Sequence, residues 1–154
     1  MDLEKGMAAP DFDLEDQDGN RWDLDKLRGQ KVVLFFYPAD ETPGCTREVC
    51  DFRDSYEYWQ RAGYIVLGVS PQDAESHRSF IANHDLKFPL LVDQDLAVAR
   101  KYGAVADQES EWEGIPILVK RSTFVIDENG DIAETFYGIR AQGHVDALRE
   151  ALSV

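Results

Sequence analysis

The chain of 154 residues has 44% hydrophobic and 30% charged side chains, and 30 Asp and Glu against 16 Lys and Arg give it a formal net charge of −14. This excess of negative charge argues against binding to nucleic acid or to an anionic membrane, since both attract basic surfaces. The sequence contains no apolar run of about 20 residues that could cross a bilayer, and no basic and apolar leader at its N-terminus. We therefore expect a single cytoplasmic domain over residues 1–154, with a hydrophobic core of its own.

Two apolar stretches open the chain. Residues 10–24, PDFDLEDQDGNRWDL, alternate apolar and polar side chains around Asp18-Gly19, a dipeptide typical of hairpin turns. Residues 31–38, KVVLFFYP, form an uninterrupted apolar run that ends at Pro38, which is typical of a strand buried on both faces of a sheet. The sequence thus predicts an N-terminal β-hairpin followed by a central strand.

A long amphipathic helix is expected directly after this strand, over residues 43–62. Its apolar side chains recur at spacings of four and three residues, which places on one face Cys45, Val49, Phe52, Tyr56 and Trp59. Thr42 suits the N-cap, and Pro43 suits the first helical position, where its missing N–H has no consequence. Cys45 therefore lies in the first turn on the buried face, and Cys50 lies toward the polar flank.

Strands and helices then alternate to the end of the chain. We expect strands at residues 64–70, 88–93, 117–127 and 131–137, and helices at 73–84, 95–102 and 142–152. The last two strands flank Glu128-Asn129-Gly130, a strong hairpin signal. This order predicts an α/β fold with a central mixed β-sheet, helices on both of its faces and a β-hairpin at the N-terminus.

The two cysteines, Cys45 and Cys50, lie close in sequence but cannot bond within an intact helix. Helical residues five positions apart have Cα atoms about 8.7 Å apart, whereas a disulfide requires less than about 7 Å. A catalytic thiol must ionise, and a helix N-terminus with a nearby cation favours the thiolate. Because Arg47 and Arg53 point away from the helical face that carries Cys45, Arg121 is the expected cation.

The stretch FFYPADETPGCTREVCDFRD resembles the active-site segment of the peroxiredoxins, and is most similar to their bacterioferritin comigratory protein, or Q-type, subfamily in the AhpC/TSA family. Pro38, Thr42 and Cys45 match the family pattern Pro-x-x-x-Thr/Ser-x-x-Cys. Cys50 matches the resolving cysteine of the Q type, and Arg121 in RSTFVID matches the distal arginine. The stretches APDFDLEDQDGN, VLGVSPQDAESHRSF and FPLLVDQD extend the resemblance over almost the whole chain.

This resemblance implies a thioredoxin-like fold and a peroxidase that reduces hydrogen peroxide and organic hydroperoxides. Cys45 would attack the peroxide and become a sulfenic acid, and Cys50 would resolve it as a disulfide once the first helical turns unwind. Thioredoxin or a similar dithiol reductant would recycle that disulfide. Thr42 would orient the peroxide, Pro38 would shield the sulfur from water, and Arg121 would stabilise the developing negative charge. No metal, flavin or haem is implied, because sulfur carries the electrons, and a resolving thiol in the same chain implies a monomer.

Two other classes of function fit parts of the pattern. A thiol-disulfide oxidoreductase also carries two redox cysteines, but such proteins space them as Cys-x-x-Cys, whereas four residues separate Cys45 from Cys50. A redox sensor would use oxidation of Cys45 to unfold the helix and expose a surface to a partner. If Cys50 were a spare thiol, an external thiol would complete a one-cysteine mechanism.

Five further residues are predicted outside the catalytic set. Glu48 either caps the helix or helps to hold Arg121, and Trp112 is expected to pack or to act as a lid near the site. The three histidines, His77, His84 and His144, have no metal-ligand spacing, and we expect them on the surface.

Overall fold

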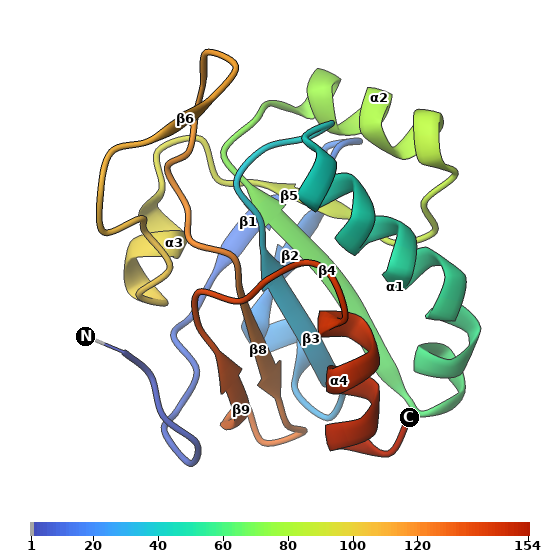
Figure 1. Cartoon of the computed structure of the whole chain (residues 1–154). Coiled ribbons are helices and arrows are strands. Elements are labelled where there is room, and N and C mark those ends of the chain that lie inside the picture. Colours follow the sequence, from blue (N-terminus) through green and yellow to red (C-terminus); the bar gives the residue numbers. More distant parts are fainter. Residues whose placement is uncertain (1) are drawn as a thin grey trace.

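A five-stranded mixed sheet, in the order β5-β4-β3-β8-β9, forms the centre of the computed structural model, which describes residues 2–154 (Figure 1). Its strands are β3 (Lys31–Phe36), β4 (Tyr64–Ser70), β5 (Leu90–Val92), β8 (Ser122–Ile126) and β9 (Ile132–Phe136). The strand β3 pairs in parallel with β4 and antiparallel with β8, and the outer pairs continue these two directions. The predicted α/β fold with a central mixed sheet is confirmed.

Both faces of this sheet are covered. One face packs against three helices, which are α1 (Pro43–Arg61), α2 (Ala74–His84) and α4 (His144–Leu152). The other face packs against the N-terminal segment, the 3-10 helix η1 (Leu24–Leu27) and the helix α3 (Ala97–Lys101). Along β3 the side chains alternate, so that Val33 and Phe35 contact the α1 side while Val32 and Leu34 contact the other. All four are fully buried, which explains the unbroken apolar run in the sequence.

Two short hairpins lie outside the main sheet. The predicted N-terminal hairpin is confirmed, since β1 (Asp13–Glu15) pairs antiparallel with β2 (Arg21–Asp23). A second hairpin, β6 (Glu111–Trp112) with β7 (Ile115–Pro116), was not predicted. None of the helices within residues 2–154 combines the length and apolar character needed to span a membrane.

Several predicted element boundaries are wrong by one or more residues, and two of the differences have a clear local reason. The strand expected over residues 117–127 begins only at Ser122, because the backbone before it pairs with the preceding loop, with Val119 opposite Val105. The helix expected over residues 95–102 covers only Ala97–Lys101, because Leu96 has a left-handed φ of 62°.

The segment between β3 and α1 positions the site. It leaves the carboxyl end of the central strand, passes beside α2 at the top of the view and enters α1 at Pro43 (Figure 1). Crevices at the carboxyl ends of strands are the usual ligand sites of open α/β sheets. Both cysteines lie on the helix that follows this segment.

Candidate active site

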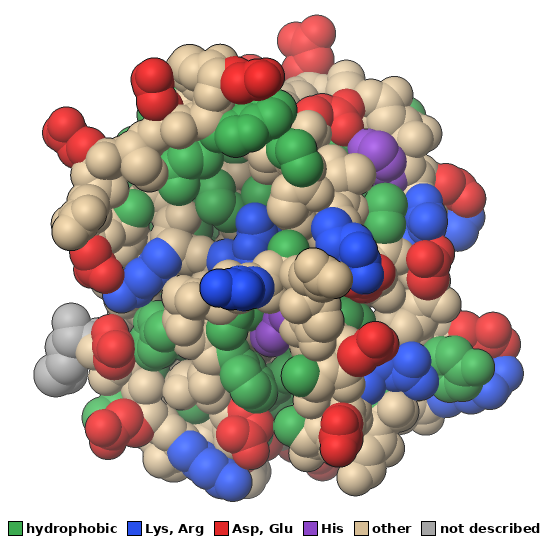
Figure 2. Space-filling view, viewed as in Figure 1, with side chains coloured by type: hydrophobic (Ala, Val, Ile, Leu, Met, Phe, Trp, Pro, Cys, Tyr) green, Lys and Arg blue, Asp and Glu red, His purple; other side chains and the backbone are tan. Residues whose placement is uncertain are grey.

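Cys45 lies in the first turn of α1 and is only 1% exposed. Around it is a pocket of about 220 Å³, lined by Pro38, Thr42, Pro43, Gly44, Cys45, Trp112, Ile117 and Arg121. Figure 2 shows a hollow of hydrophobic side chains on this face, with acidic side chains along its outer rim and basic side chains at its lower edge. The pocket thus brings a thiol and a guanidinium together in mostly apolar surroundings.

The guanidinium of Arg121 contacts two groups of α1 at once. Its Nη2 lies 3.4 Å from the Sγ of Cys45, and its Nη1 donates a 2.6 Å hydrogen bond to the Oε1 of Glu48. Although burial opposes the positive charge, the Glu48 carboxylate and the Cys45 sulfur together raise the pKa of Arg121 above its ordinary value. Arg121 therefore stays charged and places a hydrogen-bond donor against the sulfur of Cys45.

The other two candidate cations are engaged elsewhere. Arg47 pairs with Asp51 at 3.0 Å on the exposed side of α1. Arg53 pairs with Asp54 at 2.9 Å and donates to the backbone carbonyl of His84. Arg121 is thus the one of the three that contacts the sulfur.

Glu48 is fully buried beneath this arginine. Burial raises the pKa of its carboxyl group to about 7, although the positive charge of Arg121 partly offsets this effect. Within the part of the chain that the structure describes, its second oxygen, Oε2, has no hydrogen-bond partner. Of the two roles that the sequence leaves open for Glu48, the contact with Arg121 is the one present.

Thr42 occupies the N-cap position of α1, but its side chain does not cap the helix. Its Oγ1 instead donates a 2.7 Å hydrogen bond to the carbonyl oxygen of Ala39. Because the hydroxyl hydrogen is committed to that carbonyl, the lone pairs of Oγ1 are left to accept a hydrogen bond from a ligand in the pocket. The first intrahelical bond runs from the N–H of Thr46 to the carbonyl of Thr42, so the N–H of Cys45 belongs to the group that helix N-termini leave unpaired.

Gly44 makes room for the arginine, a feature that the sequence analysis missed. A Cβ at this position would lie 3.0 Å from the Nη2 of Arg121. Glycine is unfavourable inside a helix, so its presence one residue before a candidate nucleophile was a usable signal of close approach. A side chain here would displace the guanidinium from Cys45.

Cys50 lies between one and two turns further along α1, half-buried, and both thiols are free. Since residues 43–61 form one continuous helix, the ideal separation of about 8.7 Å between the two Cα atoms applies and no disulfide can form in this state. Burial raises the pKa of the Cys50 thiol above its ordinary value. In the folded helix Cys50 is therefore a poor nucleophile at neutral pH.

The prediction that the histidines lie on the surface is wrong for His77 and His144. His77 is 0% exposed and His144 is 6% exposed, while His84 is half-buried and pairs with Glu41 at 2.8 Å. The Nε2 of His144 lies 2.9 Å from the Oγ1 of Thr123. Burial, together with the positive charge of Arg121, lowers the pKa of His144 to about 4, so its ring is neutral near pH 7.

Trp112, on the β6–β7 hairpin, lines the pocket and is 38% exposed. This position agrees with the expectation that it packs near the site. Ile117 lies beside it on the pocket wall. The hairpin therefore supplies the apolar side of the hollow that Figure 2 shows.

The mixed sheet and the buried thiol at a helix N-terminus define the class of thioredoxin-like thiol proteins. Within that class, the model described as the AhpC/TSA family matches residues 6–135. A Coxiella burnetii protein named peroxiredoxin bcp is 41% identical over 148 residues, which are 94% of this chain and 95% of that one. The chloroplastic peroxiredoxin Q of Oryza sativa subsp. japonica is 47% identical over 128 residues, which are 83% of this chain and 56% of that one.

Comparison with solved structures also indicates a peroxiredoxin. The bacterioferritin comigratory protein of Xanthomonas campestris superposes with a TM-score of 0.86 and 32% identity, covering 97% of this chain and 98% of that one. The chain therefore belongs to the AhpC/TSA family and is a peroxiredoxin, a peroxidase of the bacterioferritin comigratory or Q subfamily. The resemblance and the thioredoxin-like fold predicted from the sequence are confirmed.

Proposed function

We propose that this peroxidase works by a two-cysteine mechanism within one chain, with Cys45 as the peroxidatic and Cys50 as the resolving cysteine. The Cys45 thiolate attacks one oxygen of a hydroperoxide, so that a sulfur–oxygen bond forms and the oxygen–oxygen bond breaks. Sulfur loses two electrons and becomes a sulfenic acid, and the leaving oxygen departs with a proton as water or an alcohol. Hydrogen peroxide and organic hydroperoxides are the proposed substrates. The Xanthomonas campestris relative is described as active in alkyl peroxide reduction, which supports the second class.

Three residues assist this first step. Arg121, 3.4 Å from the sulfur, stabilises both the thiolate and the charge that develops along the breaking bond. Thr42 accepts a hydrogen bond from the peroxide hydroxyl, because its own hydrogen is donated to Ala39. Pro38 is buried against the pocket and keeps water from the reacting sulfur.

The second step requires α1 to open. Cys50 attacks the sulfenic sulfur, a disulfide forms, and the oxygen leaves as water. Because the intact helix holds the two Cα atoms about 8.7 Å apart, the turns around residues 43–51 must unwind before the sulfurs can meet. Unwinding also removes Cys50 from the surroundings that raise the pKa of its thiol, and so makes it a better nucleophile.

A dithiol reductant then completes the cycle. Two electrons and two protons from thioredoxin, or from a similar protein, return both cysteines to thiols. A monomer suffices for this chemistry, because both sulfurs belong to one chain. We further propose a cytoplasmic location, since free thiols and a dithiol reductant belong to a reducing compartment.

The observation that carries the proposal is the 3.4 Å contact between Arg121 and Cys45 inside the pocket. The test is peroxide turnover with a thioredoxin system, comparing the parent with Cys45→Ser and Cys50→Ser. The first variant should be inactive, and the second should reduce about one equivalent of peroxide and then stall. Full activity of Cys45→Ser would overturn the assignment, and slow stoichiometric oxidation of the parent would indicate a redox sensor instead.

A further inference from the structure

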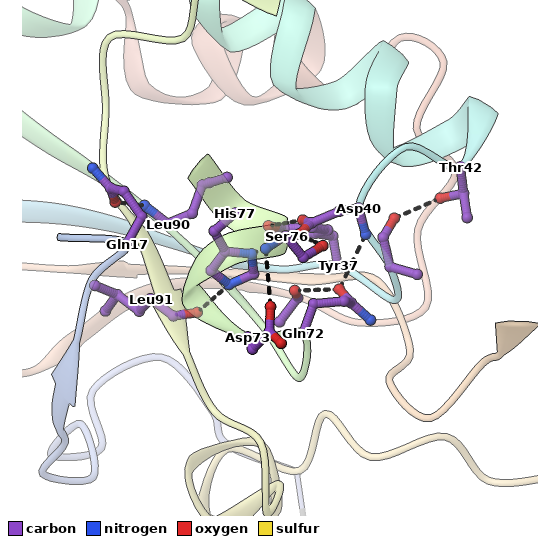
Figure 3. A network of polar contacts seen from close by, with 12 residues as sticks. Gln17, Tyr37, Asp40, Thr42, Gln72, Asp73, Ser76, His77, Leu90 and Leu91 are labelled. Atoms are coloured by element: carbon purple, nitrogen blue, oxygen red, sulfur yellow. Dashed lines mark hydrogen bonds and ion pairs between the residues drawn. The ribbon is translucent and has the colours of Figure 1, made fainter. Parts of the chain in front are cut away.

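The segment that carries Pro38 and Thr42 is tied to helix α2 by several side chains. We call residues 37–42 the catalytic segment; Figure 3 shows that its Asp40 points at the N-terminal half of α2 and at the loop before it. The ties come from a helix that contributes no residue to the pocket around Cys45. Their number and burial distinguish them from ordinary loop contacts.

The central tie joins Asp40 to His77. The Oδ2 of Asp40 lies 2.6 Å from the Nδ1 of His77, and both side chains are almost completely buried, at 2% and 0% exposure. The same Oδ2 accepts a 2.8 Å hydrogen bond from the Oγ of Ser76, and Oδ1 accepts one of 2.6 Å from the hydroxyl of Tyr37. The far side of the ring is also fixed, since the Nε2 of His77 lies 2.9 Å from the carbonyl oxygen of Leu91.

The hydrogen-bond partners of His77 determine where the protons of the Asp40–His77 pair lie. A carbonyl oxygen only accepts, so the Nε2 of His77 carries a hydrogen. The Nδ1 of the same ring meets a carboxylate oxygen of Asp40 at 2.6 Å, and one more proton lies between them. Whichever atom holds that proton, the pair is electrically neutral as a whole and fully hydrogen-bonded, which is the condition under which such groups are stable when buried.

Gln72 adds two backbone ties to the same segment. Its Oε1 accepts a 3.0 Å hydrogen bond from the N–H of Asp40, and its Nε2 donates one of 3.3 Å to the carbonyl of Pro38. The amide is itself held by the hydroxyl of Ser70, which donates to Oε1 at 2.6 Å. The backbone on both sides of Ala39, the residue whose carbonyl accepts from Thr42, is thereby fixed.

Glu41 completes the attachment at the other end of α2. It has a left-handed φ of 65°, a conformation that costs free energy for a residue with a side chain. Its carboxylate contacts the side chains of His84 and Asn83. Strain next to the catalytic Thr42 persists because the surrounding contacts hold it.

We propose that α2 acts as a clasp on the catalytic segment and that His77 is its central positioning residue. Through Asp40 it sets the place of Pro38 and Thr42 during the peroxide step. The contacts between α2 and the catalytic segment also stop the unwinding of α1 at Thr42. The first turns of α1 can then open while residues 37–42 keep their position. This inference rests on the two-cysteine function proposed above.

The reaction of Cys45 with peroxide requires Pro38 and Thr42 to be held precisely in place. A misplacement of about 1 Å at a positioning group can slow a reaction by about a hundredfold. The catalytic segment is a connection between two elements, and such connections are mobile unless they are tied down. The clasp supplies that restraint from outside the pocket, without a residue that touches the substrate.

The test uses the Cys50→Ser background, in which only the reaction of Cys45 with hydrogen peroxide occurs. His77→Asn retains an amide donor near the position of Nδ1, toward Asp40, whereas His77→Gln retains one near the position of Nε2, toward Leu91. We expect His77→Gln to lower the rate constant at least about tenfold, and His77→Asn to react at least about fivefold faster than His77→Gln. Equal rate constants for the two variants would overturn the clasp.

A milder pair of variants separates positioning from general loss of stability. Tyr37 and Tyr102 are both 0% exposed, and each donates one 2.6 Å hydrogen bond, to Asp40 and to the carbonyl of Pro10 respectively. In the same background, Tyr37→Phe should slow the peroxide step about fivefold and Tyr102→Phe less than about twofold, with similar losses in Tm. Tyr37 belongs to the catalytic segment and holds Asp40 from within it. Equal rates for the two variants would therefore show that the position of Asp40 does not govern the peroxide step, and would overturn the proposal. If the Cys50→Ser parent itself fails to react with peroxide, the proposed function falls and the clasp falls with it.

Amide exchange tests the second half of the inference. In the disulfide form of the parent, exchange should rise over residues 43–51 and stay at the level of the reduced form over residues 39–42. Loss of protection over both ranges would show that the clasp does not end the unwinding.

Discussion

Replacing Arg121 by methionine removes the guanidinium that contacts Cys45 but keeps an unbranched side chain in place of the aliphatic stem. In the parent, its Nη2 lies 3.4 Å from the sulfur and its Nη1 lies 2.6 Å from Glu48. A hydrogen bond to a charged group contributes roughly 1.5–3 kcal/mol. Loss of that contact from the transition state should therefore lower the rate constant roughly ten- to a hundredfold, at about 1.4 kcal/mol for each factor of ten.

The same replacement leaves the carboxylate of Glu48 buried without its partner. Removing one member of a buried ion pair costs about 3 kcal/mol or more in folding free energy. The positive charge of Arg121 opposes the rise in the pKa of Glu48, so this pKa should rise further in the variant. Arg121→Met should consequently be least stable above neutral pH. There the buried carboxyl group of Glu48 either ionises without a partner or keeps a proton that it would lose in the unfolded chain, and either state lowers the free energy of unfolding.

A double variant separates the two effects. Adding Glu48→Gln removes the unpaired charge, so Tm should recover, whereas the peroxide rate should stay low because the sulfur still has no cation. The assay is stopped-flow reaction with hydrogen peroxide in the Cys50→Ser background, with Arg47→Met as the matched control. Arg47 lies on the same helix but pairs with Asp51 at 3.0 Å. A rate for Arg121→Met within about threefold of that control would refute the reasoning.

Three further predictions concern the same site. Thr42→Val, which keeps the shape but loses the hydroxyl, should slow the peroxide step about a hundredfold, whereas Thr42→Ser should remain within about threefold of the parent; equal rates would contradict the role of the hydroxyl. Because burial raises the pKa of Glu48 from 4.5 to about 7, the folded protein retains a proton that the unfolded chain releases in this window. The contribution of this group to stability therefore falls as pH rises from 4.5 to about 7, and Glu48→Gln should flatten that part of a plot of Tm against pH. Cys50 reacts after α1 has unwound, when its thiol has an ordinary pKa of about 8.5. Disulfide formation after a peroxide pulse should therefore accelerate with pH below that value, by up to about tenfold per unit; a rate independent of pH would contradict this.

Much of the fold could be predicted because its strongest patterns are local. The apolar run at residues 31–38 and the helical spacing after Thr42 correspond to β3 and α1 almost residue by residue. The strand expected at residues 117–127 is partly wrong because an apolar run alone does not show its partner. The backbone around Val119 pairs with the loop at Val105, not with the sheet.

The candidate site was harder to predict where its residues are in contact in the fold but far apart in the sequence. The pairing of Arg121 with Cys45 could be inferred by excluding arginines on the wrong helical face. His77 was placed on the surface, although its spacing of three from Phe80 fits the buried face of α2. Its partner Asp40 lies 37 positions away in an irregular segment, and no local periodicity predicts such a contact.

The most direct test of the central claim is the intact mass of the protein after one equivalent of hydrogen peroxide, measured for the parent and the two cysteine variants. The account predicts that the parent loses two hydrogens as Cys45 and Cys50 join, that Cys50→Ser gains one oxygen, and that Cys45→Ser is unchanged. A parent that gains oxygen without losing hydrogen, or a Cys45→Ser variant that is oxidised as fast as the parent, would contradict it.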